Sequence, residues 1–287
     1  MSQSAFESLY AERQNAFADF LSNAIRHLDT PRSSAISELI ESMEYSLLQG
    51  GKRFRPVLSL FLAEAFGSGP QKVLPWATAI EMIHTYSLIH DDLPCMDNDD
   101  YRRGMPTNHK AFSESTALLA GDALLTEAFR QVALGFESEP EKVVQLIRIL
   151  TEAAGIQGMV GGQAIDLNSK QNSLSIPELN LMHSLKTGAL IRASCEGTAT
   201  ILGLPKEARE KCRQFGAHLG LSFQLKDDLL DSQEKIEKGS YPEALGLEET
   251  QKYLEEVNAE AAKCLAALAI QKGPLHQLLE MNNQRKT

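Results

Sequence analysis

Two aspartate-rich motifs, far apart in the sequence, each interrupt an apolar helical pattern. The first places five carboxylates in the ten residues from Asp91 to Asp100, and the second consists of Asp227, Asp228 and Asp231. Close pairs of like charges cost on the order of 1 to 4 kcal/mol at a surface-like dielectric constant. A fold that keeps both motifs therefore needs cations to bind them, and hard cations such as Mg²⁺ prefer carboxylate oxygens.

Helical geometry places the members of each motif on defined faces. Asp227 and Asp231 are four residues apart and share one face, about 6 Å along the helix axis, whereas Asp228 points roughly 100° away. Pro94 lacks a backbone donor, so we expect the helix to end there and the chain to turn Asp97 back toward that helix. Taken alone, the first motif is also typical of a solvated acidic helix end.

The rest of the chain has almost no strand signal, because Ala, Leu, Glu, Gln and Lys recur at helical spacing. The pattern and its Gly and Pro breaks predict helices over residues 4–28, 33–49, 55–66, 72–92, 108–135, 139–154, 157–169, 176–201, 206–232, 248–271 and 274–283. Long helices with short connections indicate an all-α fold, an antiparallel helical bundle around a deep central pocket. No linker of different composition interrupts it, so we expect a single domain over 1–287.

The chain is acidic, with 38 Asp and Glu against 28 Lys and Arg and a formal net charge of −10. No basic face is evident, which disfavours nucleic acid and anionic membranes as partners. The four cysteines are scattered without metal-site spacing, and no apolar run approaches the ~20 residues of a membrane-spanning helix. We therefore expect a cytoplasmic protein with no membrane span.

Basic residues cluster at three places around the acids. They are Lys52, Arg53 and Arg55 early in the chain, Arg102 and Arg103 after the first motif, and Lys186 in a later helix. One cluster alone is typical of a solvated face, but acids and bases together indicate a polyanionic ligand. Mg²⁺ usually binds through one or two carboxylates plus ligand phosphates, and Arg and Lys bind the remaining phosphate oxygens. A diphosphate fits that set, whereas the pattern of a nucleotide-binding P-loop is absent.

A second interpretation uses two histidines of the helix that carries Asp91. His84 and His90 suggest a His–Asp metal site, and with it a metal-dependent phosphohydrolase that acts through His90 and Asp91. A histidine in an apolar helix is more often a core residue, and no third histidine ligand lies nearby. The Gly-x-Ser-x-Gly pattern of serine hydrolases is also absent.

Several short motifs occur in order along nearly the whole chain. They are Gly50-Gly51-Lys52-Arg53-Phe54-Arg55-Pro56, Asp91 to Asp97 with a Pro94-Cys95 insertion, Arg102-Arg103-Gly104, Pro106-Thr107, Gly161-Gly162-Gln163, Lys186-Thr187, and Phe223-Gln224 followed by Asp227 to Asp231. In these motifs the chain resembles the all-trans short-chain polyprenyl diphosphate synthases, and most closely the bacterial-type farnesyl diphosphate synthases (geranyltranstransferases). The resemblance implies a homodimeric Mg²⁺-dependent enzyme that joins an allylic diphosphate, dimethylallyl or geranyl, to isopentenyl diphosphate.

The resemblance also implies a role for individual residues. The implied Mg²⁺ ligands are Asp91, Asp97, Asp227 and Asp231, and the other implied catalytic residues are Asp92, Asp228 and Lys186. The implied allylic diphosphate ligands are Arg102, Lys186, Thr187 and Gln224, and those of isopentenyl diphosphate are Gly51, Lys52, Arg55, His84 and Arg103. Our own hypothesis adds Lys238 to the allylic diphosphate site, because it stands just before Tyr241-Pro242. On physical grounds, a close helix crossing or a bend explains Gly161 and Gly162 better than a ligand contact does.

The geometry of the helix that carries Asp91 predicts the length of the prenyl product. Ser87 lies one turn before Asp91 and Tyr86 is adjacent, so both are expected to face down the pocket in which the product grows. A tyrosine there makes a floor, and with the Pro94-Cys95 insertion this pattern resembles enzymes that stop at farnesyl, C15. The alternatives are a C20 geranylgeranyl product and, for Tyr86, a role in core packing alone.

The segment after the second motif departs from the family. The family usually has a longer loop with Gly-Lys-x-x-Gly-x-Asp before Lys-x-Thr-Tyr-Pro, whereas this chain passes from Asp231 through six residues to Lys238-Gly239-Ser240-Tyr241-Pro242. A phosphate-holding lysine and an acid are absent, and we expect Lys235 or Lys238 to substitute. The short loop is also the one feature that suggests a non-catalytic partner subunit, against which the intact aspartate motifs argue.

Overall fold

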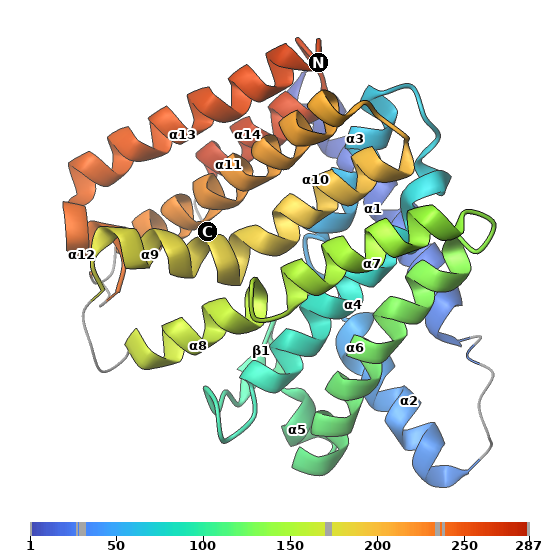
Figure 1. Ribbon diagram of the computed structural model, residues 1–287. Helices are drawn as coiled ribbons and strands as arrows, with labels where there is room; N and C mark the ends of the chain where they lie inside the picture. Colours follow the sequence, from blue (N-terminus) through green and yellow to red (C-terminus); the bar gives the residue numbers. More distant parts are fainter. Residues whose placement is uncertain are drawn as a thin grey trace.

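The computed structural model describes residues 2–26, 28, 33–169, 174–232, 236 and 239–285. Its helices are α1 (Gln3–Arg26), α2 (Ser34–Leu47), α3 (Phe54–Ala65), η1 (Pro70–Val73), α4 (Leu74–Asp91), α5 (Asn108–Ala111), α6 (Glu114–Gly135), α7 (Pro140–Ala154), α8 (Met159–Ser169), α9 (Ile176–His183), η2 (Ser184–Gly188), α10 (Ala189–Ile201), α11 (Lys206–Asp231), α12 (Tyr241–Leu245), α13 (Leu247–Ala267) and α14 (Pro274–Gln284). The strands are β1 (Tyr101–Arg102) and β2 (Met105–Pro106). The predicted all-α fold is confirmed (Figure 1).

Helix α4 lies at the centre of the bundle (Figure 1). Most of its residues are buried, from Leu74 to Ile89, as expected for a helix that is apolar on every side. It contacts α2, α3, α6 and α10, and α10 in turn contacts α11, which packs against α13. Because α4 and α11 carry the aspartate motifs and α10 contacts both, the bundle holds the two motifs in one body.

Two predicted helices differ from the observed ones for local reasons. The helix predicted over 108–135 is divided into α5 and α6, because the Ser113 side chain accepts a hydrogen bond from the Thr116 N–H and begins α6 as its N-cap. The helix predicted over 176–201 is α9 and α10, joined by the π-helical segment η2. Single π-helical turns inside α-helices often mark functional sites, and η2 contains Lys186.

The hairpin of β1 and β2 was not predicted. Arg103 and Gly104 form its two-residue turn, with φ of 53° and 79°, the positive values that the tightest hairpin turns require. Strands of two residues carry no alternating pattern that a sequence could reveal. Helix α12 was also missed, and α13 ends at Ala267 because Ala269 turns the chain with φ 61°.

One stretch of the described residues, 140–169, is long enough to cross a membrane and contains an 18-residue window with a mean hydropathy of 1.3. In the structure it is divided into α7 and α8 between Ala154 and Met159. Helix α7 packs on α10 and α8 packs on η2. A core helix of a globular protein meets the same criteria, so this stretch does not indicate a membrane span.

A buried ion pair joins the loop before α3 to α4. Arg53 Nη1 donates to Glu81 Oε1 at 2.6 Å, and Arg53 Nη2 donates to the Leu47 carbonyl at 2.7 Å. The two charged side chains are only 4% and 3% exposed. At such burial the loss of one partner leaves the other charge without compensation, which costs more than the pair itself contributes.

We predict that Glu81→Gln lowers the free energy of unfolding by about 3 to 5 kcal/mol, because Arg53 is left buried without a negative partner. Urea denaturation followed by circular dichroism measures this. The control is Glu260→Gln, which removes an exposed ion pair with Lys263 on α13 and is expected to leave stability almost unchanged. Equal effects of the two substitutions would contradict the prediction.

Candidate active site

The first aspartate motif lies where α4 ends. The chain folds back after Pro94, and the Asp97 N–H donates to the Asp91 carbonyl at 2.9 Å. The turn expected at Pro94 is confirmed. It brings the backbones of Asp91 and Asp97 together although six residues separate them along the chain.

Asp91 and Asp227 line the same cavity, which has a volume of about 570 Å³. Three polar residues from η2 and α11, Lys186, Thr187 and Gln224, line it with them. The other lining residues are Arg55, His84, Tyr86, Ser87, Leu88, His90, Met96, Met159, Val160, Gln163, Ala164, Leu167 and Phe223. The end of α4 and the second half of α11 thus contribute one carboxylate each to a cavity whose walls are largely apolar.

Burial dominates the electrostatics of these aspartates. It raises the pKa of Asp91 to about 6, an effect that Lys186 opposes and Asp97 reinforces. Burial also raises the pKa of Asp227, while the Arg285 guanidinium, 2.8 Å from its carboxylate, lowers it. Two carboxylates that the protein does not fully neutralise therefore share one cavity, which favours a cationic ligand.

The donor set fits a divalent metal ion that binds together with a diphosphate. Among the residues that the structure describes, no three His, Cys, Asp or Glu side chains form a ready-made metal cluster. Instead, single carboxylates reach the cavity from two helices, Asp91 from α4 and Asp227 from α11. Mg²⁺ binds in this way when ligand phosphates and water complete its coordination shell.

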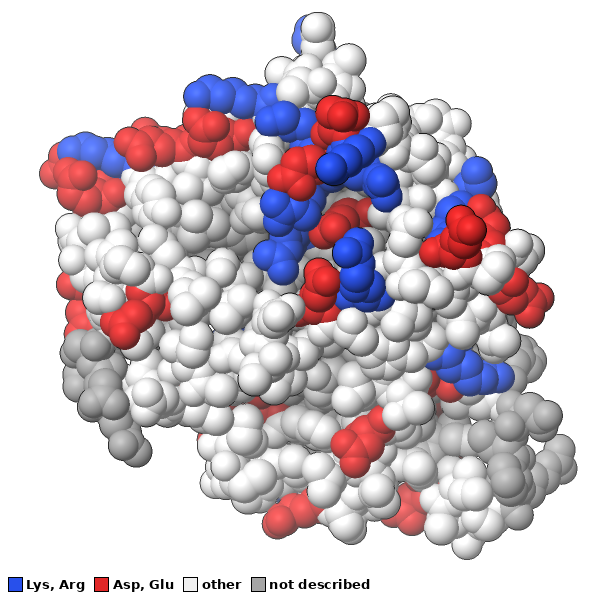
Figure 2. Space-filling model, viewed as in Figure 1, with Lys and Arg blue, Asp and Glu red and all other residues white. Residues whose placement is uncertain are grey.

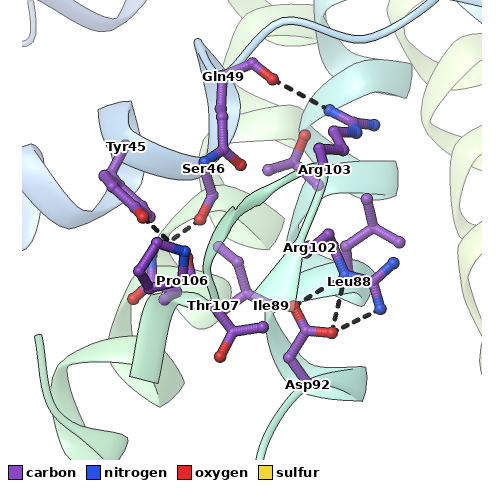
Figure 3. Close-up of a pocket in the computed structure, with 12 residues that line it drawn as sticks. Tyr45, Ser46, Gln49, Leu88, Ile89, Asp92, Arg102, Arg103, Pro106 and Thr107 are labelled. Carbon is purple, nitrogen blue, oxygen red and sulfur yellow. Dashed lines mark hydrogen bonds and ion pairs between the residues drawn. The ribbon is translucent and has the colours of Figure 1, made fainter. Parts of the chain in front are cut away.

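Asp92 and Arg102 line a different, smaller pocket beside Tyr45 and Pro106 (Figure 3). Arg102 Nε lies 2.8 and 2.9 Å from the two carboxylate oxygens of Asp92, which is only 3% exposed. The structure thus pairs Arg102 with Asp92. The catalytic role predicted for Asp92 and the diphosphate contact predicted for Arg102 stay predictions.

Asp228 is held by hydrogen bonds from its neighbours, whereas Asp231 is exposed at the end of α11. The Tyr241 N–H and Gln224 Nε2 each donate to the Asp228 carboxylate at 2.8 Å. The Thr187 hydroxyl donates to Gln224 Oε1 at 3.0 Å. Burial raises the pKa of Asp228 to about 6, against the effect of these hydrogen bonds. Asp228 therefore connects α11 to α12 directly and to η2 through Gln224.

The five residues predicted for isopentenyl diphosphate line one cavity of about 710 Å³. They are Gly51, Lys52, Arg55, His84 and Arg103. Arg55, His84 and Phe223 line both this cavity and that of Asp91, so the two cavities adjoin. Burial, followed by the charges of Arg55 and Arg103, lowers the pKa of His84 well below its usual value. A neutral imidazole and several cations thus surround the second cavity.

Asp166 is a candidate site residue that the sequence analysis missed. Its Oδ2 lies 2.5 Å from Lys186 Nζ and joins α8 to η2. Gly162 permits this approach, because a Cβ there would lie 2.2 Å from the Lys186 nitrogen. The close helix crossing predicted at Gly162 is confirmed. Asp166 lies one turn after Gly162 on the same face, and that spacing was the available signal.

Gln163 presents an unusual polar group to the Asp91 cavity. It lines the cavity, and both polar atoms of its side-chain amide are buried with no hydrogen-bond partner among the described residues. Buried amides without partners are rare in folded proteins.

His90 packs against α6. Its Nε2 donates to the Leu118 carbonyl at 3.0 Å, and a Cβ at Gly121 would lie only 2.1 Å from the same nitrogen. Its ring meets that of Tyr86 edge to face, with centroids 5.7 Å apart. The carbonyl partner places the ring proton of His90 on Nε2.

Tyr86 and Ser87 line the Asp91 cavity, and Tyr86 is 6% exposed. Both positions agree with the expected direction of these side chains, and their role in product length stays a prediction. Lys235 and Lys238 lie outside the described residues. The diphosphate contact predicted for Lys238 therefore stays a prediction as well.

Comparisons with known proteins identify a matching family model, proteins of similar sequence and a solved structure of similar fold. A family model described as polyprenyl synthetase matches residues 36–242. The chain is 41% identical to farnesyl diphosphate synthase of Bacillus subtilis (strain 168) over 96% of both proteins, and 43% identical to the chloroplastic geranylgeranyl pyrophosphate synthase of Catharanthus roseus over 79% of this chain and 68% of that protein. The crystal structure of an FPP/GFPP synthase from Zymomonas mobilis is similar with a TM-score of 0.87 and 33% identity, over 99% of both chains.

We predict that Gly162→Ala lowers the free energy of unfolding by about 1 to 3 kcal/mol, because the new Cβ would press on the Lys186 backbone rather than on a flexible side chain. Chemical denaturation measures the change. The matched control is Gly188→Ala in η2, where the nearest atom to an added Cβ is the His183 carbonyl oxygen at 3.5 Å. The prediction is wrong if Gly162→Ala is no less stable than Gly188→Ala.

Proposed function

The chain belongs to the polyprenyl synthetase family, and on this basis we propose that it is a prenyltransferase that condenses dimethylallyl or geranyl diphosphate with isopentenyl diphosphate to give mainly farnesyl diphosphate. One observation carries the proposal. The cavity lined by Asp91 and Asp227 adjoins the cavity lined by Lys52, Arg53 and Arg103, and Arg55, His84 and Phe223 line both. Two diphosphate substrates bound in such cavities would lie next to each other, which a condensation requires.

Farnesyl diphosphate synthases use a divalent metal ion, and we propose Mg²⁺, held by Asp91, Asp97, Asp227 and Asp231. When bound, the ion supplies positive charge to the departing diphosphate. The carboxylates of Asp91 and Asp227 support this assignment, because they line one cavity from α4 and α11. Asp92 and Asp228 act on their neighbours, Arg102 and Gln224, rather than on the ion itself.

The cations of the chain hold and stabilise the two diphosphates. Lys186, Thr187 and Gln224, with Arg102 and Lys238, bind the allylic diphosphate; Gly51, Lys52, Arg55, His84 and Arg103 bind isopentenyl diphosphate. Preorganised donors of this kind stabilise the charge that develops as the diphosphate leaves. The double bond of isopentenyl diphosphate then attacks the allylic carbocation, and a proton is lost to the released diphosphate.

The apolar walls protect that carbocation. Leu88, Met159 and Leu167 line the Asp91 cavity and exclude water, which would otherwise convert the cation to an alcohol. Tyr86 and Ser87 line the same cavity and, in this proposal, limit the length of the product. A C20 product is the nearest alternative, because the relatives include the geranylgeranyl pyrophosphate synthase of Catharanthus roseus.

We also propose a cytoplasmic homodimer of one polyprenyl synthase domain over 1–287. Large apolar side chains are exposed on α6, α7 and α8 and in the segment between α7 and α8: Leu118, Leu119, Leu134, Val144, Ile156 and Val160. Figure 2 shows a broad stretch without charged side chains below the charged cluster in the upper half of this face. Exposed apolar surface of this kind favours a protein partner, and a second copy of the chain is the commonest one.

We predict that purified protein with Mg²⁺, geranyl diphosphate and isopentenyl diphosphate yields farnesyl diphosphate, and that EDTA abolishes the product because the charge on the departing diphosphate is no longer balanced. Chromatography of the dephosphorylated products measures chain length. Release of inorganic phosphate without isopentenyl diphosphate would indicate a phosphohydrolase. Substrate binding with no turnover would indicate a non-catalytic subunit.

We predict that Tyr86→Ala lengthens the main product from C15 to C20 or beyond, because a smaller side chain removes the floor of the cavity. The same chromatographic assay checks this. Tyr86→Phe keeps the ring and is expected to keep the C15 product. An unchanged product length in Tyr86→Ala would remove Tyr86 from the proposed role and leave it as a core residue.

We predict that Lys238→Ala raises the KM of the allylic diphosphate or lowers kcat, because Lys238 is proposed to replace the lysine that the short loop lacks. Steady-state kinetics with the allylic substrate varied measure both constants. Unaltered constants would count against a diphosphate contact of Lys238.

A further inference from the structure

The loop before α3 contains Gly51 and Lys52, and two side chains of α1 bind its carbonyl groups. Gln14 Nε2 donates to the Gly51 carbonyl at 2.6 Å. The Tyr10 hydroxyl donates to the Lys52 carbonyl at 2.6 Å. Neither Tyr10 nor Gln14 lines the cavity that Gly51 and Lys52 line. The loop is therefore held from one side by α1 and lines the basic cavity with the other.

The conformation of this loop needs such support. Gly50, Gly51 and Arg53 have φ of 51°, 106° and 47°, values that ordinary residues rarely adopt. Arg103 adds a third contact, since its Nη1 donates to the Gly50 carbonyl at 3.0 Å. Three successive carbonyls, from residue 50 to residue 52, are thus each bound by a side chain from another element. Loss of any one contact frees a backbone that is not held by regular secondary structure.

Helix α1 is well placed to hold the loop rigidly. Tyr10 and Gln14 are four residues apart and share one face of the helix. The Tyr10 ring packs edge to face on Phe61 of α3, with centroids 6.2 Å apart, and Arg13 forms an ion pair with Glu64 of the same helix. Since α3 begins directly after the loop, α1 and α3 together fix both the loop and its donors.

We propose that Tyr10 and Gln14 are positioning residues for the isopentenyl diphosphate site, a role that rests on the proposed function. They touch no substrate. By binding the carbonyls of Gly51 and Lys52, they keep the loop in the conformation in which it lines the basic cavity. Both residues precede the segment 36–242 that matches the family model, so the loop depends on a helix outside that segment.

The chemistry of the two donors suits this role. Burial, followed by the charge of Glu81, raises the pKa of Tyr10, so its hydroxyl keeps its proton in neutral and mildly basic solution. An amide has no such titration. The contacts therefore persist across the pH range in which a prenyltransferase would be assayed.

The test uses substitutions that delete only the donor. Tyr10→Phe keeps the packed ring and removes the hydroxyl, and Gln14→Met keeps a side chain of similar length without the amide. Each is expected to raise the KM of isopentenyl diphosphate about 3- to 10-fold, with the KM of the allylic diphosphate within about 2-fold of wild type. Calorimetric titration of isopentenyl diphosphate into the protein gives a second measurement that does not need turnover.

The matched control is Tyr253→Phe on α13, which removes a half-buried phenol hydroxyl from a helix that lines neither cavity. This substitution is expected to change neither the KM of isopentenyl diphosphate nor the KM of the allylic diphosphate. An unchanged affinity for isopentenyl diphosphate in Tyr10→Phe and Gln14→Met would overturn the proposal, as would equal increases in both KM values together with a lower melting temperature. If wild-type protein itself binds no isopentenyl diphosphate, the proposed function fails instead.

Discussion

The burial of charge inside an apolar helical bundle is the constraint on which the rest of this structure depends. Four charged pairs around the two cavities join different elements of the chain. The pairs are Arg53 with Glu81, Arg102 with Asp92, Lys186 with Asp166, and Arg285 with Asp227. Of these pairs, Arg53–Glu81 is buried on both sides, and breaking it leaves an uncompensated charge at a site with little water. The pairs link the loop before α3 to α4, β1 to the residue after α4, α8 to η2, and α11 to the residue after α14.

Those features that depend on local sequence were predictable. Apolar spacing predicted the helices, and the missing donor of Pro94 predicted the turn that carries Asp97 back to Asp91. A glycine in a helix predicted the close crossing of α8 and η2, which Gly162 makes. In each case the physical cause lies within a few residues of its effect, so that the sequence alone contains it.

Features that depend on packing between distant segments were not predictable in this way. The partner of Lys186 is Asp166, twenty residues earlier, and the partner of Asp227 is Arg285 near the end of the chain. Nothing in the local pattern around Asp227 selects Arg285 among the cations of the chain. The Arg102–Asp92 pair likewise depends on a hairpin of two-residue strands, which is too short for a sequence pattern.

The wall shared by the two cavities combines a positive charge with a neutral hydrogen-bond donor. Arg55 and His84 line both cavities, and burial keeps the imidazole neutral. A neutral imidazole donates a hydrogen bond without adding to the repulsion among the surrounding arginines, while Arg55 supplies positive charge to both sides. Two diphosphates repel each other at short range, and cations between them offset that repulsion. Under the proposed function, one wall with this composition would serve both diphosphates.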